Sequence, residues 1–153
     1  MNGMRIGLES PAQPEVGRLI DALDALQKPL YPAASHHGID LEALTQPNVL
    51  FAVARTDEGV AIGCGAIVLE DGYGELKRMF VNPAARGKGV AKALLAFLEE
   101  QAKARSCSRF MLETGCLQPE ALALYARSGY VECGPFGSYS EDPNSVFMYK
   151  NAA

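Results

Sequence analysis

The segment of residues 81–105, VNPAARGKGVAKALLAFLEEQAKAR, constrains the fold more than any other part of the chain. It begins at the end of a β-rich run and passes through a turn with two glycines into a long helix. From residue 90 onward the apolar residues recur at helical spacing and form one face: Val90, Ala93, Leu94, Phe97, Leu98 and Ala102. A strand followed directly by an amphipathic helix predicts a domain in which helices pack on a sheet.

The hydrophobic pattern elsewhere predicts further strands and helices around this segment. β-rich runs occupy residues 4–10, 48–56, 59–70, 72–82, 109–115, 130–136 and 145–150, and helical runs occupy 15–27, 39–46 and 119–129. The short turns within residues 48–82 favour an antiparallel meander. The length of 153 residues suits one core, and neither a repeat nor a linker interrupts the chain. We therefore expect a single domain, residues 1–153, of the α/β (α+β) class with a central sheet.

Composition excludes several classes of partner and site. The formal net charge of −4 argues against a broad basic face, so neither nucleic acid nor a membrane is expected as a partner. The sequence shows no signal peptide and no transmembrane stretch, and its four cysteines have no metal-binding spacing. His36 and His37 lack a further ligand at suitable spacing, so we expect no metal. A cytoplasmic protein with reduced thiols is the expectation.

The glycine-rich turn before residue 90 favours an anionic ligand. A helix N-terminus leaves its first N–H groups without intrahelical partners and carries partial positive charge, which suits phosphate. Gly87 and Gly89 remove side chains where a ligand would approach, while Arg86 and Lys88 add positive charge. The alternative is a tight turn that merely requires glycine. The pattern matches neither GxxxxGK[ST] nor GxGxxG, so nucleotide hydrolysis and hydride transfer lose support.

Two motifs resemble those of the GCN5-related N-acetyltransferase (GNAT) family. Arg86-x-x-Gly89-x-Ala91, after the strand GELKRMFV, is similar to the family's acyl-CoA signature, and EALALYARSGY is similar to its penultimate helix. The element order over residues 4–150 also resembles that fold, including small stand-alone bacterial members. The resemblance implies one mixed, mostly antiparallel sheet flanked by helices. It also implies an N-acetyltransferase that uses acetyl-CoA as cosubstrate and transfers the acetyl group directly to a primary amine.

The resemblance also assigns coenzyme contacts. It implies that backbone N–H groups of the signature turn hold the coenzyme diphosphate, here Arg86, Gly87, Lys88, Gly89, Val90 and Ala91. The pantetheine arm is expected along the backbone of Met79, Phe80 and Val81, in a strand that the family splays from its neighbour through a bulge. Gln118 stands where the family often has an asparagine that contacts the coenzyme.

Three residues are candidates for proton transfer by the same resemblance. Tyr125 occupies the position of the acid that protonates the departing thiolate, although a tyrosine on an amphipathic helix is otherwise a core residue. Glu75 and Glu113 are candidate bases, directly or through water. Either glutamate is equally well read as a solvated or ion-paired strand carboxylate, with Lys77 and Arg78 as candidate partners. A backbone N–H near Phe80 or Val81 is the expected oxyanion donor.

The resemblance implies that the acceptor is recognised by the segment after the first helix, Lys28 to Asp40, and by the last hairpin, Pro135 to Ser145. Candidate lining residues there are Tyr31, His36, His37, Phe136, Tyr139, Glu141 and Asp142, although these loops are polar for ordinary reasons too. The expected partner is a small-molecule or peptide amine, and an edge strand near the C-terminus allows a homodimer. The alternatives are a non-catalytic acyl-CoA-binding regulatory module and, more distantly, a nucleotide-binding domain.

Overall fold

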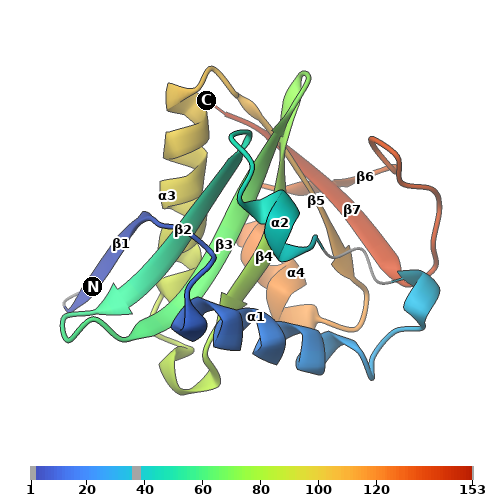
Figure 1. Cartoon of the computed structure of the whole chain (residues 1–153). Coiled ribbons are helices and arrows are strands. Elements are labelled where there is room, and N and C mark those ends of the chain that lie inside the picture. Colours follow the sequence, from blue (N-terminus) through green and yellow to red (C-terminus); the bar gives the residue numbers. More distant parts are fainter. Residues whose placement is uncertain (1–2, 36–38, 153) are drawn as a thin grey trace.

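The computed structural model describes residues 3–35 and 39–152. Its strands form one sheet in the order β1-β2-β3-β4-β5-β7-β6. Their bounds are β1 (Met4–Leu8), β2 (Val49–Thr56), β3 (Ala61–Glu70), β4 (Tyr73–Val81), β5 (Arg109–Gly115), β6 (Val131–Cys133) and β7 (Ser145–Asn151). Only the β4–β5 pair is parallel among the strand pairs of the described residues. The predicted mixed, mostly antiparallel sheet is therefore confirmed (Figure 1).

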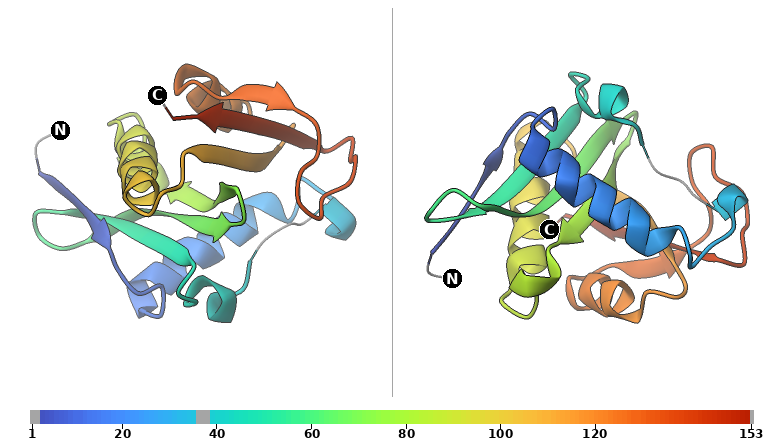
Figure 2. Two further views of the ribbon diagram at one scale, coloured as in Figure 1. Left: turned by 90° about the horizontal axis from the view of Figure 1, so that it is seen from above. Right: turned by 60° about the horizontal axis from the view of Figure 1, so that its bottom comes forward.

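Helices cover both faces of the sheet. Their bounds are α1 (Pro14–Gln27), α2 (Leu41–Leu44), α3 (Val90–Ala104) and α4 (Pro119–Arg127), with short 3₁₀ turns at Ala33–Ser35 and Pro83–Ala85. The views of Figure 2 place α1 across one face and α3 and α4 across the other. Two hydrophobic clusters reflect this division, one under α1 and α2 and one under α3 and α4. None of the helices in the described ranges is long and apolar enough to span a membrane.

Most predicted elements are present, and several differ in extent: the helix predicted over 39–46 is confined to Leu41–Leu44, and the first strand ends at Leu8. The meander of β2, β3 and β4 is confirmed, but the strand predicted over 130–136 ends at Cys133, before Gly134 and Pro135. The buried face of α3 includes Leu95 and Glu99, whereas the predicted Ala93 and Phe97 are only half-buried. Glu99 is buried because it accepts hydrogen bonds from the Tyr130 hydroxyl and the Lys150 ammonium, both at 2.8 Å.

A bulge in β4 opens the sheet at its centre. Between Cys64 and Ala66 of β3 the register gains one residue on β4, since these two residues pair with Phe80 and Lys77. The extra residue, Arg78, has φ of 57°, a conformation that is strained for a side chain other than glycine. The parallel pairing of β4 with β5 covers only residues 74–76 and 110–112. Beyond these residues the described parts of the two strands separate and leave a gap.

Candidate active site

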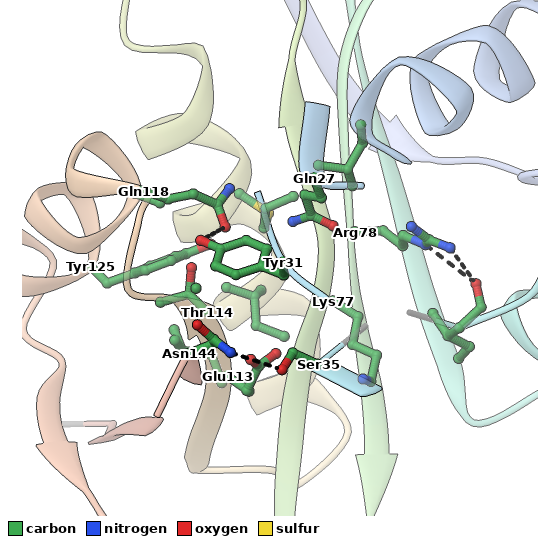
Figure 3. Close-up of a pocket in the computed structure, with 17 residues that line it drawn as sticks. Gln27, Tyr31, Ser35, Lys77, Arg78, Glu113, Thr114, Gln118, Tyr125 and Asn144 are labelled. Carbon is green, nitrogen blue, oxygen red and sulfur yellow. Dashed lines mark hydrogen bonds between the residues drawn. The ribbon is translucent and has the colours of Figure 1, made fainter. Parts of the chain in front are cut away.

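A cavity of about 110 Å³ lies in the gap between β4 and β5. Its walls come from both sides of the sheet, because Leu23 and Gln27 of α1 line it together with Ala121 and Tyr125 of α4. Figure 3 shows the polar side chains that project into it from the separated strands and from the surrounding loops. The bulge therefore produces a passage that residues from both faces of the sheet reach.

The turn before α3 is open to solvent. Gly87 and Gly89 have φ of 80° and 78°, and Gly89 is the N-cap of the helix. Both are exposed, and a Cβ added at either would meet no heavy atom of the described residues within 4 Å. Among the described residues, none accepts a hydrogen bond from the N–H groups of Gly87, Lys88 and Gly89. Glycine is needed here for the backbone conformation, and the free N–H groups leave a place for an anion.

Arg86 holds this turn against the end of β4. Its Nε donates to the carbonyl of Val81 at 3.1 Å, and its guanidinium lies 5.7 Å from the centre of the Phe80 ring. The positive charge predicted beside the turn is thus fixed between the helix N-terminus and the separated strand. The segment 79–81, where the pantetheine arm is predicted, leads directly into this turn.

The two candidate glutamates have different surroundings. Glu75 is buried, accepts a hydrogen bond from the Tyr139 hydroxyl and forms an ion pair with Lys77 at 3.1 Å. Glu75 is outside the set of residues that lines the cavity, whereas Glu113 belongs to it. Glu113 is half-buried and accepts a hydrogen bond from the Ser145 hydroxyl at 2.7 Å. The ion-paired interpretation therefore fits Glu75, and Glu113 is the carboxylate at the cavity.

Tyr125 is buried and lines the same cavity as Glu113. Its ring packs edge-on against Tyr130, with 5.9 Å between the ring centres. Burial raises the pKa of Tyr125 above its usual value, so the hydroxyl keeps its proton at neutral pH. Within the described ranges no hydrogen bond engages this hydroxyl, which leaves the proton available to a ligand in the cavity.

The predicted acceptor residues divide into two groups. Tyr31 lines the cavity, and its hydroxyl donates to Oε1 of Gln118 at 3.2 Å (Figure 3). Phe136 and Tyr139 instead pack edge-on with each other and with Phe147, beside the buried Glu75. His36 and His37 lie outside the described residues.

Sequence reasoning missed several polar side chains that line the cavity. They come from the bulged part of β4, from the 3₁₀ turn after α1, from β5 and from the loop before β7: Lys77, Arg78, Ser35, Thr114 and Asn144. Arg78 donates to Asp24 at 2.6 Å and, through Nη2, to the carbonyl of Ile39 at 3.0 Å. No sequence signal placed these residues at one cavity, because the separation of β4 from β5 that brings them together arises only in the fold.

The four cysteines are free thiols, and Cys64 is the buried one. Among the described residues, no three His, Cys, Asp or Glu side chains are grouped to hold a metal ion. Burial raises the pKa of the Cys64 thiol to about 12, which keeps it protonated at neutral pH.

Comparison with known proteins gives consistent matches. The sequence model of the acetyltransferase (GNAT) family matches residues 19–130. An "IAA acetyltransferase" of Azospirillum brasilense is 47% identical over 98% of this chain and 99% of its own length. The uncharacterized N-acetyltransferase YsnE of Bacillus subtilis is 41% identical over 78% of this chain and 80% of its own.

Solved structures match as well. A Klebsiella pneumoniae protein described as an acyl-CoA N-acyltransferase is 39% identical, with a TM-score of 0.84 over 98% of each chain. The PaiA N-acetyltransferase of Thermoplasma acidophilum, solved in complex with coenzyme A, is 16% identical, with a TM-score of 0.77 over 97% of this chain and 98% of that one. At that identity the second likeness concerns the fold alone.

Proposed function

The chain belongs to the GNAT family of acetyltransferases, and on that premise we propose that it transfers the acetyl group of acetyl-CoA to a primary amine. The proposal treats residues 1–153 as one catalytic domain, which is supported by the single sheet that all described strands join. The observation that carries it is the cavity between β4 and β5, where Tyr125 and Glu113 come together.

The coenzyme is proposed to enter along the separated end of β4. Its diphosphate is proposed to bind the unpaired N–H groups of Gly87, Lys88 and Gly89 at the N-terminus of α3, since charge-assisted hydrogen bonds from backbone N–H groups favour an anion there. The N–H of Arg86, which the resemblance includes in this set, instead donates to the carbonyl of Pro83 at 3.3 Å. Its pantetheine amides are proposed to pair with the backbone of Met79, Phe80 and Val81. Gln118, at the N-cap of α4, lines the cavity and is suited to a contact with the arm.

Acetyl-CoA supplies a thioester carbonyl, and the chain supplies orientation and proton transfer. Glu113 is proposed to accept a proton from the acceptor ammonium, directly or through water, so that the nitrogen lone pair is free to attack. As the C–N bond forms and the C–S bond breaks, Tyr125 donates its proton to the departing sulfur. The second proton that the nitrogen loses on becoming an amide returns through water to the Tyr125 phenolate, and Glu113 releases its proton to solvent. A backbone N–H near Phe80 or Val81 is proposed to stabilise the charge that develops on the carbonyl oxygen.

The acceptor is proposed to approach from the α1 side of the sheet. Leu23, Gln27 and Ile39 line that side of the cavity, and Arg78, which also lines it, forms an ion pair with Asp24 at 2.6 Å. A volume of about 110 Å³ suits a small amine or the end of a longer side chain rather than a bulky group.

The test measures the release of free CoA thiol from acetyl-CoA in the presence of each amine of a panel. IAA is added to the panel because the Azospirillum relative carries that name. We expect thiol release with at least one amine and N-acetylated product by mass spectrometry. Binding of acetyl-CoA without release on any acceptor would favour a regulatory module. Acetylation of IAA but of no amine would replace the proposed acceptor class.

A further inference from the structure

The side chain of Tyr31 occupies a slot that exists because residue 115 is glycine. Tyr31 follows α1, while Gly115 is the last residue of β5. A Cβ added at Gly115 would overlap the hydroxyl oxygen and ring of Tyr31, which provide its three nearest atoms. Both residues are buried and both line the cavity. Tyr31 and Gly115 therefore fit together as a plug and its seat.

Hydrogen bonds hold this plug in one orientation. The Tyr31 hydroxyl accepts from the backbone N–H of Leu117 at 3.1 Å and donates to Gln118 Oε1 at 3.2 Å. In Figure 3 the ring lies between Gln118 and Gln27 with its hydroxyl directed toward the Gln118 amide. A tyrosine ring needs a fixed partner for its polar end when it is buried, and this one has two. The ring therefore forms a defined part of the cavity wall.

We propose that Tyr31 determines the size of the acceptor that the cavity admits. This inference rests on the proposed function, since it concerns the acceptor of that same site. The ring forms part of the wall of the cavity of about 110 Å³ that Tyr125 and Thr114 also line. Removing a large buried side chain from a protein can leave a cavity of about 150 Å³, which is enough to bind benzene. Without the Tyr31 ring, the site would thus admit an acceptor larger by about one aromatic ring.

The functional test compares Tyr31→Ala with Tyr31→Phe on two amines. The ratio of kcat/KM for 2-phenylethylamine to that for ethylamine measures size preference. We expect the ratio to rise about tenfold in Tyr31→Ala, which corresponds to about 1.4 kcal/mol. Tyr31→Phe keeps the ring and loses the hydroxyl, so its ratio should stay within about twofold of the wild type. An unchanged ratio in Tyr31→Ala, with a folded protein, overturns the proposal.

A substitution at Gly115 tests the contact itself. Gly115→Ala should displace the Tyr31 ring and lower kcat/KM for ethylamine in the otherwise unchanged protein. The same substitution in Tyr31→Ala meets an empty slot, so it should have little further effect. Equal losses in both backgrounds would mean that Gly115 acts independently of Tyr31, which contradicts the plug and seat.

A binding measurement separates this inference from the proposed function. p-Cresol has the structure of the tyrosine side chain, so it should enter the slot of Tyr31→Ala. Calorimetry should show it binding at least about tenfold more tightly to Tyr31→Ala than to the wild type or Tyr31→Phe. Equal binding by all three proteins would refute the slot. If the wild type acetylates no amine, the proposed function fails, while p-cresol binding still decides whether the slot exists.

Discussion

Replacing Gly89 by glutamate should weaken the binding of coenzyme A without unfolding the protein. Gly89 is exposed, has φ of 78° and is the N-cap of α3, so a side chain here projects beside the proposed diphosphate site. Any residue other than glycine pays about 1–2 kcal/mol for this backbone conformation. The informative comparison is therefore between Gly89→Glu and Gly89→Gln, which share the strain and the bulk and differ in charge.

The expected difference in affinity follows from electrostatics. At about 6 Å, a carboxylate and a doubly charged diphosphate repel by about 1.4–5.5 kcal/mol for effective dielectric constants of about 80–20. Screening at physiological salt, with a Debye length of about 8 Å, reduces this to about 0.7–2.6 kcal/mol. Gly89→Glu should thus bind coenzyme A roughly three- to eightyfold more weakly than Gly89→Gln. The difference should shrink as salt is added.

Stability should change in the opposite direction. A negative charge near a helix N-terminus stabilises the helix by about 0.3–1 kcal/mol, so Gly89→Glu should melt at or above the temperature of Gly89→Gln. Gly72→Glu is the control for the position of the charge. Gly72 also has positive φ, at 87°, but it precedes the first residue of β4, at the other end of the strand from the turn. Calorimetry measures affinity, and thermal unfolding measures stability. Equal affinity of all three variants would refute a diphosphate site at this turn.

Further predictions concern proton transfer and stability. Tyr125→Phe should lower kcat by about 10²–10⁴-fold, while the affinity for acetyl-CoA stays within about twofold of the wild type. Because burial raises the pKa of Tyr125, titration of this residue should cause no loss of wild-type activity below about pH 10. Glu113→Gln should lower kcat by about 10²-fold, whereas Glu75→Gln should mainly lower the unfolding free energy, by about 1–3 kcal/mol. If kinetics and urea unfolding instead show the loss of kcat in Glu75→Gln and the loss of stability in Glu113→Gln, Glu75 is the base. Arg55→Ala should cost about 2 kcal/mol of unfolding free energy at pH 7, because Arg55 donates to Glu9 at 2.8 Å. Hydrogen bonding by Arg55 lowers the pKa of Glu9. The loss of unfolding free energy in Arg55→Ala should therefore be full above about pH 5 and should decline as the pH falls below about 4. A loss that does not depend on pH in urea unfolding would contradict the pairing.

The sequence predicted the elements that depend on local patterns. The meander follows from period-two runs with short turns, and α3 follows from apolar spacing after residue 90. The sequence also predicted the glycine-rich turn. Gly87 and Gly89 both have positive φ, a backbone conformation that favours glycine.

Features set by distant contacts were not readable. Arg78 adopts positive φ although it is not a glycine, and Asp24 and the Ile39 carbonyl, far away in sequence, hold its side chain. The choice between Glu75 and Glu113 depends on Tyr139, which comes from a loop and covers Glu75. These contacts exist only after the chain has folded, so no periodicity in the sequence records them.

The contact between Tyr31 and Gly115 is another feature of the candidate site that the sequence pattern did not predict. The sequence pointed to Tyr31 as one of several loop residues that an acceptor could meet. Its fit over Gly115 joins positions 84 residues apart, and the two residues carry no shared motif. Only the folded chain distinguishes this tyrosine from Tyr139, which packs among aromatic rings instead.

A crystal structure of the protein with coenzyme A tests the central claim most directly. We predict that the diphosphate oxygens accept hydrogen bonds from backbone N–H groups within residues 86–91, at about 2.7–3.1 Å, and that the sulfur lies in the cavity between β4 and β5 beside Tyr125. A diphosphate bound elsewhere on the protein, with this turn still exposed to solvent, would contradict the account.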